Sequence, residues 1–390
     1  MALGHALGEL APEIRPRSDA CVAAAVRRVV VVGAGITGLT CALACARAGV
    51  QVDVLEARVS VLRAPAHIDL VPNLLRELAR LGVAQACVQR GFAYTGVAVL
   101  DEHGDEAFRL PTPHLAGRQL PPAAGIAHDA LIDVLCEAAV QAGATLHHGM
   151  PVRSVDAQHG RVTAGSGRVF DADLVLLATG AESPLVSAVL GAAQPAGMQH
   201  TWWHAPLPRP AWLDRSTWMA GSVGRRLFLV PVGMAHAGLA VVTETPPQGP
   251  ADAGALRRLL NNWGALPRRI AAALDPASPT TLRRVVSSLR EAPWSRGAVL
   301  CVGAAAHAIA PPFGQSAAQV LEDAVVLGEL LGRAPDREQL LQQFGERRTA
   351  RVHELHALVE QGARWLARPE PGTDLMALGR RIDAIVARPA

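Results

Sequence analysis

The feature that most constrains this 390-residue chain is the stretch RVVVVGAGITGLTCALACARAGVQVDVLE, residues 28–56. Its valine run, Val29 to Val32, predicts a buried parallel strand, because the run is apolar on both faces and too short for a helix. A G-x-G-x-x-G turn follows, then a helix-compatible segment over 39–48 and a second strand over 50–55. Together these features predict a strand–helix–strand unit of the dinucleotide-binding kind.

Each glycine of the turn has a separate task in such a site. Gly33 permits the tight turn, Gly35 lets the backbone approach a pyrophosphate, and Gly38 lets the helix pack closely on the strand. The N–H groups at the start of the helix, at Ile36 and Thr37, favour the negative charge of the phosphates. A purely structural unit without a nucleotide is the alternative, but the complete combination favours a nucleotide.

An acid ends the second strand of this unit. Glu56 follows the glycine turn by about 20 residues, where a carboxylate can bind a ribose 2′-OH. We assign its neighbours Ala57 and Arg58 to the same site. The carboxylate argues against NADP at this position, because a 2′-phosphate would face a negative charge.

Composition excludes several classes of function. The formal net charge is +3 and every fixed basic side chain is an arginine. These arginines are scattered among acids, which is not the clustered footprint of a nucleic-acid-binding protein. No apolar run reaches the length of a membrane span, so we expect neither a nucleic-acid nor a membrane partner.

The cysteines indicate a reduced protein. The six cysteines show no C-x-x-C spacing. Cys41 and Cys45 lie four residues apart in the first helix, and we expect buried thiols there rather than a metal pair. We therefore predict a cytoplasmic protein without a metal site. Residues 1–26 lack the pattern of a signal peptide and are expected to form a flexible extension.

The rest of the chain alternates between strand and helix patterns. Strands are predicted over 96–100, 106–110, 145–148, 151–156, 173–180, 282–289 and 298–303, and helices over 74–81, 128–142, 251–274, 315–331 and 337–366. Residues 200–244 are rich in strand patterns and tryptophan. Nucleotide-fold segments thus lie at both ends of the chain, with a strand-rich insertion between them. This order predicts a discontinuous dinucleotide domain that encloses a second, antiparallel domain.

The order of these motifs resembles the single-component, FAD-dependent aromatic hydroxylases, the p-hydroxybenzoate hydroxylase-like flavoprotein monooxygenases. The resemblance covers roughly residues 27–366. It is carried by the glycine turn with Glu56 and the following L-V-P-N (70–73), and by a strand that ends at Gly180. It is also carried by VGAAAHAIAPPFGQSAAQVLEDA (302–324), which is similar to the family's G-D-A-A-H…P…G-Q-G…E-D-A segment.

The resemblance implies an α/β fold in which a discontinuous Rossmann-like FAD-binding domain carries an inserted antiparallel-sheet substrate domain and a C-terminal helix. We expect the FAD-binding domain over 27–90, 120–186 and 283–333, the substrate domain over 91–119 and 187–282, and the helical region over 334–390. The positions that match the family's FAD contacts are Gly33, Gly35, Ile36, Thr37, Gly38, Glu56, Ala57, Arg58, His128, Thr179, Gly180, Gly303, Ala304, Pro311, Gly314, Gln315 and Ser316.

The activity implied by the resemblance is hydroxylation of an aromatic or heteroaromatic small molecule. It would use FAD, O2 and NAD(P)H as a transient reductant, through a flavin C4a-hydroperoxide. The family chemistry needs little from protein acids and bases, and no catalytic residue is assigned. The sequence leaves the substrate, the choice between NADH and NADPH, and the oligomeric state open.

Several positions depart from the family's pattern. Ala304 stands where an aspartate hydrogen-bonds the ribityl chain, His128 stands for an arginine, and Ser316 stands for a glycine. Thr179 replaces the aspartate of a D-G pair. Each lost hydrogen bond costs on the order of 0.5–1.5 kcal/mol, about tenfold in affinity, so FAD could be dissociable.

These departures leave two alternatives open. One is another flavin oxidoreductase, a dehydrogenase or reductase, because the strand end A-T-G (178–180) resembles that of flavoprotein reductases. The other is a non-catalytic relative with weakened FAD binding.

Substrate contacts are expected from the inserted sheet and from the loop before residue 315. The helix that starts there would point its N-terminus at the flavin's pyrimidine end, and Gly314 would leave room for the ring. The candidates for substrate contact are Trp203, Trp218, Phe228, Pro312 and Phe313. His204 or His236 could deprotonate a phenol and Arg225-Arg226 could bind a carboxylate, but we expect these side chains to be solvated. His307 is expected to be structural.

Overall fold

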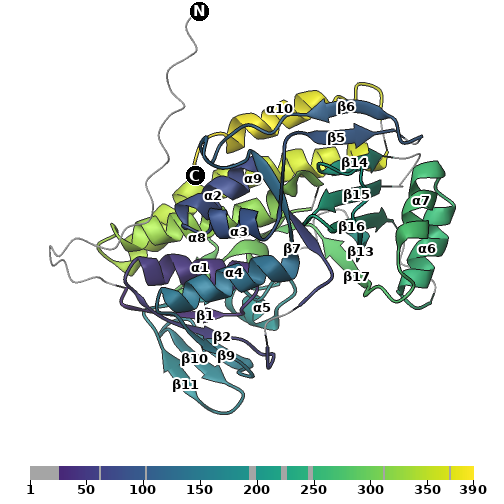
Figure 1. Cartoon of the computed structure of the whole chain (residues 1–390). Coiled ribbons are helices and arrows are strands. Elements are labelled where there is room, and N and C mark those ends of the chain that lie inside the picture. Colours follow the sequence, from purple (N-terminus) through teal and green to yellow (C-terminus); the bar gives the residue numbers. More distant parts are fainter. Residues whose placement is uncertain are drawn as a thin grey trace, which may run out of the picture.

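The computed structural model describes residues 26–60, 63–101, 103–192, 199–220, 226–244, 249–310, 312–368 and 370–390. A parallel sheet covered by helices lies beside a second, mainly antiparallel sheet, and long C-terminal helices run past both (Figure 1). None of the described helices is long and apolar enough to cross a membrane.

The first sheet joins segments from distant parts of the chain. Its strand order is β19-β20-β12-β1-β2-β8. The bounds are β1 Arg28–Val32, β2 Gln51–Leu55, β8 Thr145–His147, β12 Leu174–Leu177, β19 Ser295–Arg296 and β20 Val299–Cys301. All neighbours pair in parallel except β19 with β20. Because Val31 at the centre pairs with Leu176 on one side and Val54 on the other, the valine run is buried on both faces.

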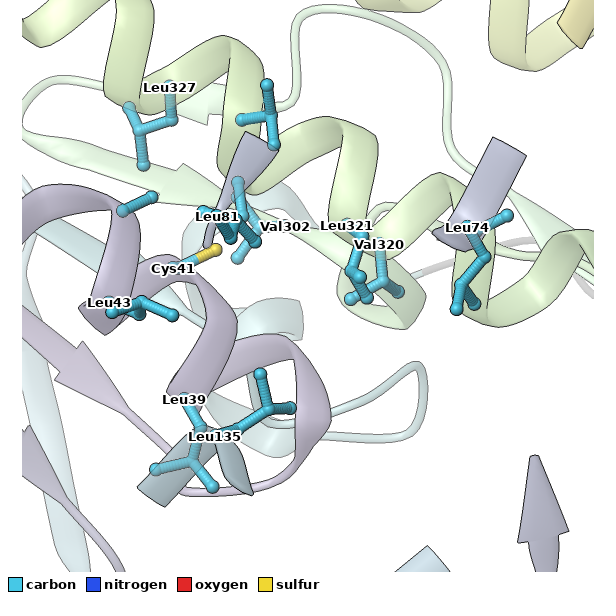
Figure 2. Packing of buried hydrophobic residues seen from close by; sticks show 14 of the residues in the cluster. Leu39, Cys41, Leu43, Leu74, Leu81, Leu135, Val302, Val320, Leu321 and Leu327 are labelled. Atoms are coloured by element: carbon cyan, nitrogen blue, oxygen red, sulfur yellow. The ribbon is translucent and has the colours of Figure 1, made fainter. Parts of the chain in front are cut away.

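Helices cover this sheet and form the main core with it. Helix α1 (Ile36–Arg47) packs against both α4 (His128–Gln141) and α8 (Gln315–Leu331). Leu39 of α1 lies beside Leu135 of α4, and Leu321 and Leu327 of α8 belong to the same cluster (Figure 2). Each such leucine contributes roughly 1.5–3 kcal/mol by its burial. The core therefore fixes the starts of α1 and α8 relative to the sheet.

The second sheet forms the inserted unit. Its strand order is β17-β13-β16-β15-β14-β5-β6, antiparallel apart from the β14–β5 pair. The bounds are β5 Val97–Leu100, β6 Glu106–Leu110, β13 Gln199–Pro208, β14 Thr217–Ala220, β15 Arg226–Pro231, β16 His236–Thr243 and β17 Thr281–Val286. Its outer face is covered by α6 (Ala253–Asn261) and α7 (Ala265–Ala273) (Figure 1).

The helix predicted over 251–274 is in fact this pair. Gly264 has φ 121°, a conformation that favours glycine, and the chain turns there.

Smaller elements complete the fold. They are β3 His67–Leu70, β4 Phe92–Tyr94 and β7 Ala123–Ala127 in one small sheet, β9 Val152–Asp156, β10 Arg161–Ala164 and β11 Val169–Asp171 in another, the pair β18 Ser288–Leu289 and β21 His307–Ala308, and the helices α2 Pro72–Arg80, α3 Ala84–Gln89 and α5 Pro184–Leu190. Two short 3-10 turns, η1 Gly303–Ala305 and η2 Pro312–Gly314, precede α8.

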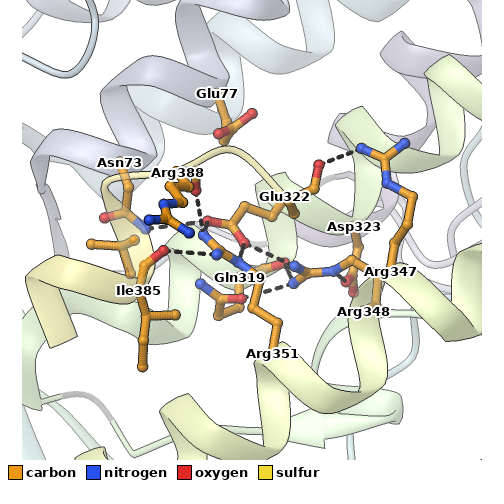
Figure 3. Close-up of polar contacts among 12 residues, drawn as sticks. Asn73, Glu77, Gln319, Glu322, Asp323, Arg347, Arg348, Arg351, Ile385 and Arg388 are labelled. Carbon is orange, nitrogen blue, oxygen red and sulfur yellow. Dashed lines mark hydrogen bonds and ion pairs between the residues drawn. The ribbon is translucent and has the colours of Figure 1, made fainter. Parts of the chain in front are cut away.

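The C-terminal helices close the structure. Helix α9 (Arg337–Ala367) packs along α8, and α10 (Leu375–Val386) packs on α9. Buried charges join them: Arg348 of α9 lies 2.8 Å from both Glu322 and Asp323 of α8, and all three side chains are fully buried (Figure 3). The half-buried Arg351 adds a third contact, 2.8 Å from Glu322. Each charge in this network thus has a partner of opposite sign.

Candidate functional site

The glycine turn leaves open space above the start of α1. A Cβ on Gly33 (φ 102°) would lie 2.8 Å from the carbonyl oxygen of Ala178, and one on Gly38 would collide with the carbonyl oxygen of Gly33. A Cβ on Gly35, by contrast, would meet no atom within 4 Å. The protein's own packing therefore requires glycine at 33 and 38. At 35 the missing side chain keeps an outer surface free, as the approach of a pyrophosphate requires.

The acid at the end of β2 is oriented by this turn. Glu56 Oε2 accepts a hydrogen bond of 2.9 Å from the N–H of Ala34, and its Oε1 accepts one of 3.0 Å from the N–H of Arg58. The side chains of Ala57 and Arg58 are exposed. A carboxylate has about four acceptor sites, so lone pairs remain for a ribose hydroxyl.

The loop after β20 lies on the start of α1. A Cβ on Gly303 would come within 2.8 Å of both Cγ2 and Oγ1 of Thr37. The N–H of Gly303 donates to Asp323 Oδ2 at 2.9 Å, which ties the loop to α8. His307, further along, is buried with its Nε2 2.7 Å from the same oxygen, as a structural histidine would be. Ala304 is half-buried and offers no carboxylate.

The end of β12 lies beside the same turn. The Thr179 hydroxyl is buried, and no hydrogen-bond partner lies within the described part of the chain. Gly180 has φ 86°, and a Cβ there would meet no atom within 4 Å. A buried hydroxyl without a partner and two open glycine surfaces, at 35 and 180, fit a bound dinucleotide with polar groups along its length.

His128 is the first residue of α4, which packs on α1. Its backbone N–H donates to the carbonyl of Ala66 at 2.9 Å. Burial lowers the pKa of the imidazole, so the ring is neutral near pH 7 and does not supply the fixed positive charge of an arginine.

The start of α8 differs from expectation at Gly314. Phe313 and Gly314 both have left-handed φ angles, of 70° and 67°. A Cβ on Gly314 would lie 2.5 Å from Cγ1 of Val71, so this glycine makes room for a protein side chain rather than for a flavin ring. Gln315 is buried and exchanges hydrogen bonds of 3.1 and 3.3 Å with Asn73. Ser316 is exposed, and Pro311 lies outside the described residues.

Three of the predicted substrate residues come together. The Trp218 ring meets Phe228 edge-on at 5.8 Å and Phe313 edge-on at 5.6 Å. Its Nε1 donates to Ser216 Oγ at 3.2 Å, and that hydroxyl donates to Asp69 Oδ2 at 2.7 Å. The tryptophan is thus fixed both by ring contacts and by a polar chain that reaches Asp69 in β3. Pro312 lies in the 3-10 turn just before Phe313.

Trp203 does not belong to this group. It packs with the cluster under α6 and α7, whereas its neighbour Trp202 stacks on Phe228 at 5.4 Å in the main core. Consecutive residues of a strand point to opposite faces, so only one of the two tryptophans can face the nucleotide-binding domain. The expectation of substrate contact at Trp203 is therefore wrong.

Two basic groups that we expected to be solvated are enclosed. Burial lowers the pKa of His204, which stacks on Trp202, to about 4. Arg226 is 1% exposed and donates to Nδ1 of His200 and to the carbonyl of Ala363, at 3.2 and 3.4 Å. His236 is exposed, as expected, and Arg225 lies outside the described residues.

A pocket adjoins the Trp218 group. Trp218, Phe313 and Gln315 line it together with the start of α2, the β5–β6 hairpin, the loop that follows the hairpin and one face of α10. We did not predict from the sequence that α10, with Asp383, lines this pocket. Nothing in the sequence of a short amphipathic segment indicates that one of its acids faces a pocket.

Comparisons with known proteins agree with this geometry. A model of the FAD binding domain family matches residues 27–358. The chain is 29% identical over 340 residues to 2-heptyl-3-hydroxy-4(1H)-quinolone synthase of Pseudomonas aeruginosa, covering 83% of this chain and 85% of that protein. It is 28% identical over 344 residues to an FAD-dependent urate hydroxylase of Klebsiella pneumoniae, covering 84% and 87%.

The fold also matches a crystal structure. Klebsiella pneumoniae HpxO complexed with FAD and uric acid superposes with a TM-score of 0.78 at 23% identity, over 93% of this chain and 97% of that chain. The predicted family, fold class and FAD cofactor are confirmed. The chain belongs to the FAD-binding flavoprotein monooxygenases of the p-hydroxybenzoate hydroxylase type and is an FAD-dependent monooxygenase.

Proposed function

We propose that the enzyme hydroxylates a fairly apolar aromatic or heteroaromatic small molecule in the pocket beside Trp218, with NAD(P)H and O2 as co-substrates. One observation carries the proposal. Phe313 lies in the wall of this pocket and also in the turn directly before α8, the segment that matches the family's flavin-contacting loop. A molecule in the pocket would therefore lie next to the cofactor segment.

FAD would be held by residues from both ends of the chain. The turn over 33–38, Glu56, the buried Thr179 hydroxyl, the loop over 303–304 and the start of α8 are the groups that would contact it. When bound, FAD supplies the redox chemistry and the activation of oxygen. No second dinucleotide fingerprint occurs in the sequence, which supports a transient encounter with NAD(P)H.

The protein's own contribution is to orient the substrate ring and to exclude water. Trp218, Phe228 and Phe313 supply rigid aromatic surface, and the hydrogen bond from Trp218 to Ser216 holds the central ring in one orientation. With a pKa of about 4, His204 is a weak base near pH 7 and is not assigned to proton transfer.

The relatives support the substrate class. Their names include a 4(1H)-quinolone and urate, both planar ring systems. The mainly apolar lining here, with Val71, Leu110, Trp218 and Phe313, favours a less polar ring than urate.

Labelled oxygen tests the proposal. FAD-loaded protein is incubated with NADH or NADPH and a panel of aromatic compounds under 18O2, and the products are analysed by mass spectrometry. We expect substrate-stimulated NAD(P)H oxidation and one 18O atom in the product. Product without label would favour a dehydrogenase or reductase, and no NAD(P)H oxidation with any compound would favour a non-catalytic relative.

A further inference from the structure

One face of α10 forms part of the pocket wall. Gly379, Ile382, Asp383 and Val386 all line the pocket, at the spacing i, i+3, i+4, i+7 that places residues along one side of a helix. A Cβ on Gly379 would lie 3.6 Å from Cδ2 of Leu110, so the helix and the β5–β6 hairpin approach each other closely beside the pocket. Asp383 therefore lies in the wall of a narrow, largely apolar space.

The other polar side chains of this wall have partners within the protein. Asn73 and Gln315 exchange hydrogen bonds with each other. The Thr112 hydroxyl accepts a hydrogen bond of 2.8 Å from the N–H of Gly96. Among the residues that the structure describes, the half-buried carboxylate of Asp383 has no hydrogen-bond or ion-pair partner. Of the described residues that line the pocket, it is also the single charged one.

The surroundings do not neutralise this carboxylate. Arg76 comes close to the end of α10, but its Nη1 donates to the carbonyls of Val386 and Ala387, at 2.8 and 3.2 Å. Burial raises the pKa of Asp383, and no charged neighbour opposes the shift. Removing a carboxylate partly from water costs free energy when no hydrogen-bond donor replaces the water. A hydrogen-bond donor on a bound molecule would offset this cost.

The chemistry of the pocket wall limits which hydrogen-bond donor on a ligand could pair with Asp383. An ionised carboxylate only accepts hydrogen bonds, and an N–H in an aromatic ring only donates them. A hydrogen bond between the two therefore satisfies the N–H without any further group. A phenolic O–H also carries lone pairs that need donors, and the side-chain amides of Asn73 and Gln315 already bond each other. A carboxylate on the ligand would be repelled by Asp383.

We propose that Asp383 accepts a hydrogen bond from the ring N–H of the substrate, so that the enzyme takes N–H heteroaromatic compounds and Asp383 positions their ring against Trp218 and Phe313. This inference rests on the function proposed above and names the class of substrate for the same pocket. Asp383 is a positioning residue, because the oxidised carbon is elsewhere on the ring.

Binding to FAD-loaded protein without NAD(P)H tests the inference, measured by isothermal titration calorimetry. The probes are matched pairs that differ only in N–H against oxygen: indole with benzofuran, and quinolin-4(1H)-one with chromone. We expect each N–H compound to bind about 10- to 100-fold more tightly than its oxygen counterpart, as for a hydrogen bond to a charged group. Equal affinities within each pair, or no binding by either N–H compound, would overturn it.

Two variants assign the preference to the carboxylate. D383N should weaken binding of the N–H probes about tenfold and leave the oxygen probes unchanged, and D383L should remove the preference entirely. The control E354Q removes a negative charge from an exposed position on α9 and should keep the preference of the wild type. A preference that survives in both D383N and D383L would contradict the inference.

The readouts separate this inference from the proposed function. Probe binding requires neither reduction nor oxygen, so a reduced preference in D383N and a lost preference in D383L would stand even if no 18O were incorporated. Conversely, oxygenation without any N–H preference would leave the monooxygenase intact and overturn the role of Asp383. With an N–H compound that the enzyme oxidises, D383N should raise KM at least tenfold. It should also increase the release of hydrogen peroxide, because a loosely oriented ring is oxygenated less efficiently.

Discussion

Glu56 Oε2 accepts a hydrogen bond from the N–H of Ala34, so the acid at the end of β2 is joined directly to the glycine turn before α1. Because Oε1 is held by the N–H of Arg58, both oxygens have fixed positions. In Glu56→Gln one of these N–H groups would face an NH2 group instead of an acceptor. We expect FAD affinity to fall about tenfold, measured by quenching of flavin fluorescence, because one charge-assisted hydrogen bond is lost. Unchanged affinity would show that Glu56 serves only the turn.

Ala304 offers a gain-of-affinity test. It stands where the family carries an aspartate, in the η1 turn that lies against Thr37. Ala304→Asp should tighten FAD binding by up to about tenfold, because it restores one hydrogen bond to the ribityl chain. Ala304→Asn, which restores an acceptor without the charge, should give a smaller gain. Weaker binding in both variants would place the loop away from the ribityl chain.

The buried pairs of Arg348 with Glu322 and Asp323 should contribute strongly to the stability of the folded protein (Figure 3). Arg348→Met would leave two buried carboxylates without their central cation and should lower the free energy of unfolding by about 3–5 kcal/mol, measured by urea denaturation. Arg90→Met breaks an exposed pair with Glu137 at 2.7 Å and should cost less than about 1 kcal/mol. Equal losses in the two variants would contradict the burial argument.

Stability should decrease in mild acid because of a buried histidine. Burial and, as the smaller cause, the positive charge of Arg226, which donates to its Nδ1, lower the pKa of His200 from 6.5 to about 4. Below pH 6.5 the unfolded chain binds a proton that the folded protein excludes, so the free energy of unfolding falls until about pH 4. His200→Asn, which keeps an acceptor but does not titrate in this range, should show a shallower decline between these pH values. An identical pH profile would assign the acid sensitivity to other groups.

Elements with a strong local pattern were predictable from the sequence. The helix predicted over 315–331 is α8 residue for residue, and the valine run and the hairpin strands over 96–110 match β1, β5 and β6 within one or two residues. Their apolar periodicity, together with Gly or Pro at the ends, is a local property. The strand β7 (Ala123–Ala127) was not predicted, because an alanine- and glycine-rich segment shows no alternation and becomes a strand only between β3 and β4.

The site was less predictable than the fold, because it depends on which residues face one another. Alternation along β13 could have placed Trp202 and Trp203 on opposite faces, but only the packed structure shows that 203 lies under α6 and α7. No local signal could reveal that Val71 fills the space at Gly314, or that Asp383 and Phe313 line the same pocket, since tertiary packing alone brings these residues together.

We propose above all that the open backbone at the start of α1 holds the diphosphate of FAD. Gly35→Val tests it, because Gly35 has φ −77° and a Cβ there meets no atom within 4 Å, so the apoprotein should keep its thermal stability. Gly345→Val, at a position of α9 whose Cβ would also meet nothing within 4 Å, is the control. The decisive measurement is equilibrium titration of FAD into the two apoproteins and the wild type. We predict that Gly35→Val alone loses at least about a hundredfold in affinity, because its side chain blocks the approach of the pyrophosphate. Wild-type affinity in a folded Gly35→Val would contradict the claim.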